Sequence, residues 1–146
     1  MAQTLAERFD AEVAAGFMRA NEKLTGLPKF LGLRIIDIGP GTLRAEMSVR
    51  EELLTPFKNV HGGVISAVCD HVLGCVCYPV MKRGQWAATT EFKLNLLAPV
   101  TGGTITADAT IASFARTQAV VRIDVSNDGR LCAIAQGTVT IRDPKV

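Results

Sequence analysis

The residues best suited to chemistry lie in one stretch, in which His61-Gly62-Gly63 is followed seven positions later by Asp70. Two adjacent glycines remove side chains from a place where a ligand must approach the backbone closely. When such a pair opens a helix, the first backbone N–H groups can bind an oxyanion or a carbonyl oxygen. A nearby carboxylate can act as a general base or as a nucleophile. The stretch therefore predicts a site in which a carboxylate acts on a bound carbonyl group.

Residues from about 63 to 80 are predicted to form one long helix that carries this carboxylate. Spaced at about 100° per residue, the apolar side chains fill about half of the circumference, which is the side for a sheet. The opposite, small face carries Ser66, Ala67, Asp70, Gly74 and Cys77. Small residues let a ligand or another backbone come close, so we expect this face to be covered.

The spacing of His61 and Asp70 bears on how a complete site is made. Nine residues correspond to about two and a half helical turns and roughly 13 Å of rise, so the two ends point to opposite sides. Within one chain they are badly placed to meet on one small substrate. Two antiparallel copies of the helix, packed through their small faces, would bring one N-terminus beside the other Asp70. The spacing thus predicts a symmetric dimer with two sites at its interface.

The elements around this helix show the period of two that is typical of strands. Strands are expected at residues 33–38, 43–49, 90–96, 104–111, 121–125 and 131–142. Asn127-Asp128-Gly129 is a strong hairpin signal, residues 51–60 form a loop, and Gly137 marks an expected bulge in the last strand. Together they predict an α+β domain in which a mostly antiparallel sheet wraps one central helix.

The N-terminus predicts an additional helix that packs on the domain as a lid. Apolar side chains recur there every four positions, at Leu5, Phe9, Val13 and Phe17. This spacing predicts an amphipathic helix over residues 4–24, which Gly26 and Pro28 end. The chain then divides into a helical segment, 1–28, and a single domain, 29–146.

The composition excludes several classes of function. The chain has 146 residues, is 48% hydrophobic and carries a net charge of +2, which fits one globular domain. Its basic residues are spread thinly, so we expect no nucleic-acid partner. No stretch approaches the roughly 18 to 20 apolar residues of a membrane span, and acidic residues near the N-terminus argue against a secretory signal. We expect a cytoplasmic protein with no membrane partner.

The four cysteines, Cys69, Cys75, Cys77 and Cys132, lack the CxxC spacing of a metal site. We interpret them as reduced thiols that pack as small core residues, and we expect no metal. A catalytic cysteine would need a base, and none lies at a helpful spacing.

The order of these motifs resembles a known family. The resemblance is carried by three motifs in order: His61-Gly62-Gly63 with Asp70 on a single helix after two strands, then Thr89 to Pro99, then a Gly-Thr-Ile-Thr-Ala run from position 103. With these motifs the chain resembles hotdog-fold acyl-CoA thioesterases of the phenylacetate-degradation, PaaI-like type. The resemblance covers about residues 30–142. It implies the hotdog fold and hydrolysis of an acyl-CoA without metal or organic cofactor. It also implies a homotetramer built from dimers, with each site between two subunits.

The resemblance assigns catalytic roles by position. Asp70 matches the helix carboxylate that acts as general base or nucleophile, and the Gly62 N–H matches the donor that polarises the thioester carbonyl. His61 matches a histidine that orients this loop, and Thr89 matches a hydroxyl residue that holds the attacking water or bonds to the aspartate. Strand phase places Thr89 with Glu91 and away from the apolar face, so it needs a bulge, or the start of the strand, to face the site.

The resemblance also suggests residues that bind the substrate. The family commonly has Asn six residues before the histidine, where this chain has Thr55, so either Thr55 or Asn59 takes the carbonyl contact. Gly63 and Ser66 complete the expected set near the helix start and on the small face. Arg116, where the family often has Gly followed by Arg or Lys, is a candidate contact for the nucleotide phosphates.

Two other functions fit a domain of this kind. A hotdog hydratase or dehydratase on acyl thioesters would also use a His and an acidic residue, although the spacing of His61 and Asp70 favours hydrolysis. The second alternative is a protein that binds acyl-CoA without turning it over. His71 is not a catalytic partner of Asp70, because neighbours in a helix do not face each other.

Overall fold

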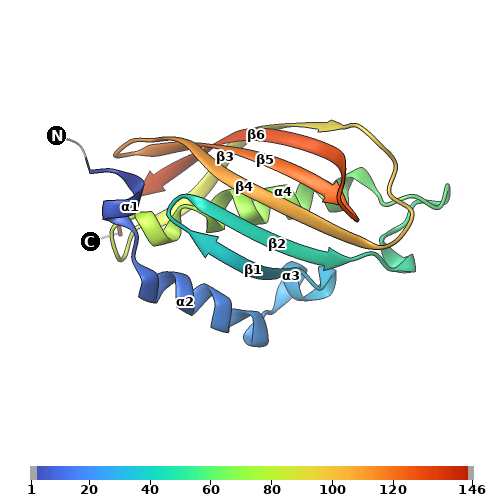
Figure 1. Ribbon diagram of the computed structural model, residues 1–146, viewed down its shortest axis with the longest axis horizontal. Coiled ribbons are helices and arrows are strands. Elements are labelled where there is room, and N and C mark those ends of the chain that lie inside the picture. The colour runs from blue at the N-terminus through green and yellow to red at the C-terminus, as the bar shows by residue number, and fades with distance from the viewer. Residues whose placement is uncertain (1–2, 145–146) are drawn as a thin grey trace.

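The computed structural model describes residues 3–144 as an antiparallel sheet wrapped around one long helix, α4 (Gly62–Cys75) (Figure 1). The six strands are β1 (Arg34–Gly39), β2 (Thr42–Ser48), β3 (Trp86–Leu96), β4 (Thr104–Phe114), β5 (Gln118–Asn127) and β6 (Arg130–Arg142). Their order across the sheet is β1-β2-β4-β5-β6-β3, and all neighbours are antiparallel. The predicted α+β hotdog architecture is confirmed.

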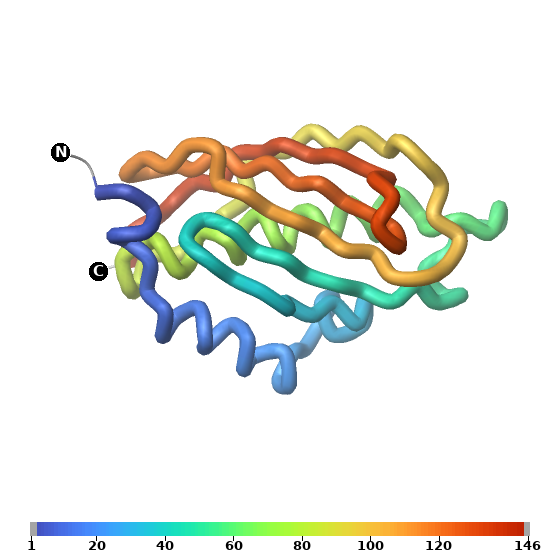
Figure 2. The backbone as a smooth tube through the Cα atoms, in the orientation of Figure 1, coloured from blue at the N-terminus to red at the C-terminus, as the bar shows by residue number. Residues whose placement is uncertain are grey.

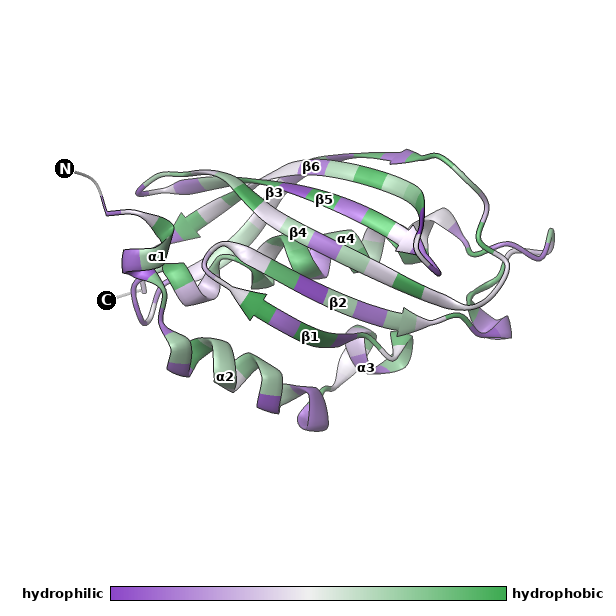
Figure 3. Ribbon diagram, viewed as in Figure 1, coloured by the Kyte–Doolittle hydropathy of each residue, from purple (hydrophilic) through white to green (hydrophobic). Residues whose placement is uncertain are grey.

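The period of two along the strands gives the sheet one inner and one outer face. In β4, Ile105, Ala107 and Ala109 are buried, whereas the residues between them are partly open to solvent. Figure 3 shows the resulting alternation of hydrophilic and hydrophobic bands along β2 and β4. The inner face packs against the apolar side of α4, which buries Ile65, Val68, Cys69, Val72 and Leu73. Burial of these side chains holds the helix at a fixed place across the sheet.

The central helix is shorter than the expected 63–80. The α-helix ends at Cys75, and Tyr78–Val80 forms the 3-10 turn η3, because Pro79 has no N–H for the α-helical pattern. Cys77 is therefore buried in the core instead of lying on the small face. The expectation that no stretch reaches the length of a membrane span is also wrong. Judged by length and composition alone, Gly62–Val80 is long and apolar enough to cross a membrane. The structure places 56% of its most apolar window inside the protein, as a core helix requires.

The N-terminal segment is broken, so the single helix expected over 4–24 is wrong. It consists of α1 (Leu5–Arg8), α2 (Ala11–Ala20), the 3-10 turn η1 (Asn21–Lys23) and α3 (Gly26–Leu31). The break lies at Asp10, whose carboxylate accepts from the backbone N–H groups of Glu12 and Val13 and so caps a new helix. The segment packs on the domain, as its amphipathic pattern predicts: Phe17 lies 5.2 Å from Tyr78 between ring centroids.

The two edges of the sheet differ. At β1, the Asn21 side chain donates to the Ile35 carbonyl (2.6 Å) and accepts from the Ile35 N–H (3.0 Å), as a neighbouring strand would. The chain trace shows α2 running beside this edge (Figure 2). At the other edge, β3 pairs with β6 alone among the strands of residues 3–144. An unpaired edge is a template for another chain, so β3 is the edge open to pairing.

A bulge in β3 decides where Thr89 points. Thr89 pairs with Val139 and Glu91 pairs with Thr138, so Thr90 is the extra residue between them. Paired residues in an antiparallel sheet share a face, and Val139 is buried. The bulge therefore turns Thr89 toward the inner face, which meets the condition set by the strand phase.

Gly137 is regularly paired with Phe92, so the bulge expected at this position is wrong. The glycine instead lets the helix and the neighbouring strand come close to β6. A Cβ at position 137 would lie 2.5 Å from the Phe92 Cβ and from the Glu91 carbonyl oxygen, and 2.7 Å from the Leu73 Cδ1. Most of the atoms in this contact belong to the backbone or to core side chains, so they cannot easily move to make room for a Cβ.

We expect Gly137→Ala to lower the free energy of unfolding by about 1–3 kcal/mol, because the added methyl overpacks the contact between α4 and the sheet. Urea denaturation measures this difference. The matched control is Gly102→Ala, whose Cβ would meet nothing within 4 Å and which should change stability by less than about 0.5 kcal/mol. Equal stability of the two variants would contradict the close approach of α4 to β6.

Candidate active site

The start of α4 is capped by the side chain of His61. Its Nδ1 accepts a hydrogen bond from the Gly63 backbone N–H at 2.8 Å. Because Nδ1 is the acceptor, a neutral ring in this arrangement carries its proton on Nε2. The Gly62 N–H, in contrast, donates to no atom within residues 3–144. Of the two predicted backbone donors, Gly63 is used by the cap and Gly62 points out of the helix without a partner.

The segment before His61 folds back on itself. Leu54 and Val60 form an isolated β-bridge. Inside this loop the Thr55 N–H donates to the Asn59 carbonyl at 2.7 Å, and the Thr55 hydroxyl donates to the Asn59 side-chain oxygen at 2.9 Å. The two candidates for the missing family asparagine are therefore bonded to each other. Together they close the loop that sets the position of His61.

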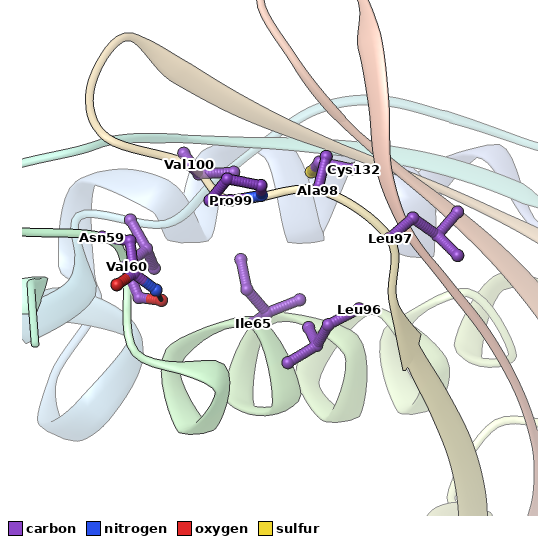
Figure 4. A pocket seen from close by; sticks show the side chains of 9 residues that line it. All are labelled: Asn59, Val60, Ile65, Leu96, Leu97, Ala98, Pro99, Val100 and Cys132. Carbon is purple, nitrogen blue, oxygen red and sulfur yellow. Dashed lines mark hydrogen bonds between the residues drawn. The ribbon is translucent and has the colours of Figure 1, made fainter. Parts of the chain in front are cut away.

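A cavity of about 260 Å³ opens beside the start of α4 (Figure 4). Figure 4 shows Ile65 and Leu96 at the side of the helix, and Pro99 and Val100 across from them. The lining is mainly apolar and consists of Asn59, Val60, Ile65, Leu96, Leu97, Ala98, Pro99, Val100 and Cys132. Leu96 reaches the helix start, since a Cβ at Gly62 would lie 2.9 Å from its Cδ1. Gly62 therefore lies next to Leu96, one of the residues that line this largely apolar cavity.

Asp70 lies on a different part of the same helix. Eight residues separate it from Gly62, which is about 12 Å of rise. Its side chain is exposed and makes no hydrogen bond or ion pair within the described chain. It stands at a second cavity, of about 200 Å³, whose other walls come mainly from α3 and the residues after it. Within one chain, the carboxylate and the Gly62 donor do not meet, as their spacing predicted.

Ser66 and Thr89 are the two hydroxyl residues that were predicted to act beside this carboxylate. Ser66 precedes Asp70 by four residues on the same face of α4 and is half-buried. Thr89 is also half-buried and lies on the inner face of β3, the strand at the open edge. Neither hydroxyl forms a hydrogen bond with Asp70 in the described part of the chain.

His71 and Cys75 form a neighbouring pair, with 3.7 Å between the imidazole Nε2 and the sulfur. Burial lowers the pKa of His71, and the charge of Asp70 opposes that shift. Burial likewise raises the pKa of Cys75 to about 12, with a further contribution from Asp70. A thiol with this pKa stays protonated near neutral pH and is a poor nucleophile. The raised pKa of Cys75 therefore supports the interpretation that this residue packs in the fold and does not act as a nucleophile.

The other cysteines also behave as small core residues. Cys69, Cys77 and Cys132 are buried, and all four cysteines are free thiols. Burial raises the pKa of Cys69 and of Cys77 to about 12. Within residues 3–144, no three His, Cys, Asp or Glu side chains come together as ligands for one metal ion.

Arg116 lies far from the start of α4 within the same chain. It occupies the turn between β4 and β5, and Figure 1 shows this turn at the same end of the molecule as the C-terminal end of α4. There it lines a cavity of about 410 Å³ together with two other basic residues, Arg8 and Lys82, and with Phe114. The Arg8 guanidinium stacks over the Phe114 ring at 5.4 Å. The structure thus gathers Arg116 with other cations but does not join it to His61.

One helix therefore carries the two predicted reacting groups at separate places. One offers a backbone donor beside an apolar cavity, and the other offers a carboxylate beside an apolar cavity. A long central helix wrapped by a six-stranded antiparallel sheet is the architecture of the hotdog fold. The thioesterase superfamily model matches residues 57–134, a span that contains both Gly62 and Asp70 and more than half of the chain. The chain belongs to the thioesterase superfamily and is a thioester hydrolase.

Individual relatives agree with this assignment. The 1,4-dihydroxy-2-naphthoyl-CoA hydrolase of Listeria monocytogenes is 23% identical over 80% of this chain and 96% of that protein. A thioesterase from Haemophilus influenzae has a similar structure, with a TM-score of 0.82, 25% identity and coverage of 87% of this chain and 90% of the other. The E. coli PaaI protein, from the phenylacetic acid degradation operon, shares the fold with a TM-score of 0.81 at 22% identity, over 92% of this chain and 96% of that one. The resemblance to hotdog-fold thioesterases is confirmed, and the likeness to the PaaI protein is one of fold.

Proposed function

We propose that the protein hydrolyses an acyl-CoA to the free acid and CoA, at sites formed between two copies of the chain. The observation that carries this proposal is the state of two groups on α4. The Gly62 N–H and the Asp70 carboxylate both lack partners within residues 3–144, and about 12 Å of helix keeps them apart. A second, antiparallel copy would bring its Asp70 carboxylate beside the Gly62 N–H of the first copy, so that one substrate can contact both groups.

The reaction needs one acceptor of a proton and one donor to an oxyanion. The thioester carbonyl oxygen lies at the Gly62 N–H, which stabilises the negative charge that develops there. Asp70 of the other copy takes a proton from water as the water attacks the carbonyl carbon. The C–S bond then breaks, and CoA leaves as a thiolate that takes up a proton. If Asp70 is instead the nucleophile, it forms an acyl anhydride with release of CoA, and water hydrolyses the anhydride.

The remaining candidate residues support the substrate around these two groups. His61 fixes the helix start through its cap on Gly63, and Asn59 closes the preceding loop. Thr89 and Ser66 hold the attacking water or the ligand beside Asp70. Arg116, with the basic residues around it, is placed for the nucleotide phosphates of CoA. No metal or organic cofactor takes part in these steps.

The two edges of the sheet support an assembly through β3. Asn21 occupies the outer edge of β1, whereas β3 is open. Antiparallel pairing of β3 with its copy would continue the sheet and lay the two α4 helices side by side in opposite directions. The dimers then assemble into a homotetramer in the cytoplasm. The named substrate of the Listeria monocytogenes relative, a CoA thioester, supports the choice of CoA as the thiol.

Asp70→Asn keeps the shape of the side chain but removes its charge and basicity. We expect kcat for acyl-CoA hydrolysis to fall by at least about 10²-fold, because a lost general base typically costs that much or more. Binding of acyl-CoA, followed by calorimetry, should stay within a few-fold of the wild type. Free thiol release measures the rate.

The matched control for Asp70→Asn is Asp124→Asn, an exposed carboxylate on the outer face of β5, which should leave kcat unchanged. Full activity of Asp70→Asn would contradict the mechanism. Hydration of an unsaturated acyl-CoA by the wild type without thiol release would instead identify a hydratase, and binding without turnover would identify a silent binder.

Gly62→Pro removes the proposed donor while keeping the helix start. Proline is favoured at the first helical position, and His61 before it has the extended backbone (ψ 134°) that proline requires. We expect kcat to fall by about 10²- to 10³-fold, as for loss of one oxyanion donor. Gly62→Ala brings a similar contact with Leu96 but keeps the N–H, so it is the control for steric effects. Equal kcat values for the two variants would exclude the Gly62 N–H as the donor.

A further inference from the structure

One amide side chain of the β5–β6 hairpin holds the C-terminal end of the turn between β3 and β4, residues 97–103. The Asn127 Nδ2 donates to the Gly102 carbonyl at 2.8 Å and to the Thr104 carbonyl at 3.2 Å. These two carbonyls flank Gly103, whose backbone is in the left-handed conformation (φ 76°). Asn127 is half-buried, so both hydrogen bonds are partly shielded from water. The amide therefore fixes the path of the chain from the turn into β4.

The N-terminal end of the same turn is held by β6. The Leu97 and Ala98 N–H groups both donate to the Cys132 carbonyl, at 2.8 and 3.2 Å. The Arg130 guanidinium donates to the Pro99 carbonyl at 3.1 Å. Cys132 is buried and Arg130 is exposed. The strands of one hairpin thus hold both ends of the turn.

The middle of the turn supports the segment that leads into α4. The Val100 carbonyl accepts from the Val60 N–H at 2.7 Å, and Figure 4 shows these two residues on neighbouring segments. Val60 is 5% exposed and Val100 is 4% exposed, so breaking this hydrogen bond would leave polar groups unpaired in the core. His61 follows, with its N–H donating to the Leu53 carbonyl at 3.0 Å. A buried contact therefore sets the position of the helix start relative to the turn.

We propose that Asn127 is a positioning residue for the Gly62 N–H and acts through the turn at 97–103. The inference rests on the proposed function, since it takes this N–H as the donor to the thioester carbonyl. Such a donor is effective only where it meets the charge that develops in the transition state, and small displacements are costly. Asn127 holds the turn, the turn holds Val60, and α4 begins two residues later. The amide thus affects the rate through the backbone.

Asn127→Ala removes both hydrogen bonds but keeps the hairpin turn, whose left-handed residues are Asp128 and Gly129 (φ 46° and 83°). We expect kcat for acyl-CoA hydrolysis to fall by about tenfold, because the donor is displaced and not removed. KM should stay within about twofold, since the affected interaction forms in the transition state. Thiol release from acetyl-CoA, hexanoyl-CoA and benzoyl-CoA measures both constants.

The decisive measurement repeats this substitution in the Gly62→Pro background. If Asn127 acts through the Gly62 N–H, removal of the N–H removes the effect, and the double variant should match Gly62→Pro within about twofold. A merely structural residue would lower kcat by the same factor in both backgrounds, because the effects of independent sites multiply. Equal factors overturn the positioning role, and so does a wild-type kcat in Asn127→Ala.

Two further variants support the comparison. Asn127→Asp keeps the size of the side chain and removes the NH2 donor, so it should show the same pattern and replaces Asn127→Ala if that variant does not fold. Gln136→Ala is the matched control. Its amide is exposed on the outer face of β6 and forms no hydrogen bond within residues 3–144, so kcat should be unchanged in both backgrounds.

The outcomes separate this inference from the proposed function. Absence of thiol release by the wild type from any acyl-CoA overturns the proposed function and this inference with it. Hydrolysis that Gly62→Pro leaves unchanged overturns the donor, and with it the role of Asn127, but not hydrolysis. Hydrolysis that depends on Gly62, with equal factors in the two backgrounds, overturns the role of Asn127 alone.

Discussion

The rest of the molecule depends on the packing of one straight helix into one curved sheet. The sheet buries the apolar side of α4, so the orientation of the helix is fixed and its small face turns away from the core. Along that helix, a backbone donor and a carboxylate are held about 12 Å apart. Neither can move toward the other without breaking the core. A rigid core thus keeps these two groups apart within one chain, as the proposed shared site requires.

Other features of the fold are consistent with a site that two copies of the chain share. The bulge at Thr90 turns Thr89 inward at the open edge, next to where a second copy would pair. The side chain of Asn21 closes the opposite edge, which leaves β3 for association. The broken N-terminal segment places α3 over the helix, where hydrogen bonds from Arg50 to two carbonyls of α3 fix it beside Asp70. In the proposed enzyme, the same core therefore sets the reacting groups and the assembly.

The strands and the start of α4 were predictable because their signals are local. Alternating burial follows directly from period two, and two glycines after His61 mark a helix start. Features that depend on distant contacts were not predictable. The cap at Asp10 was hidden by a regular apolar period, and the bulge at Thr90 is defined only by its pairing with β6. The hydrogen bond between Thr55 and Asn59 and the wall formed by α3 also require the folded chain.

The sharing of sites between subunits is tested most directly by mixing two defects. Gly62→Pro and Asp70→Asn chains carrying different affinity tags would be co-expressed, and the mixed dimers isolated through both tags. If each site takes Gly62 from one copy and Asp70 from the other, one of the two sites in a mixed dimer is intact, and about half of the wild-type kcat is expected. If both groups served one site within one chain, every site would carry a defect. Mixed dimers no more active than the parent variants would contradict the shared site.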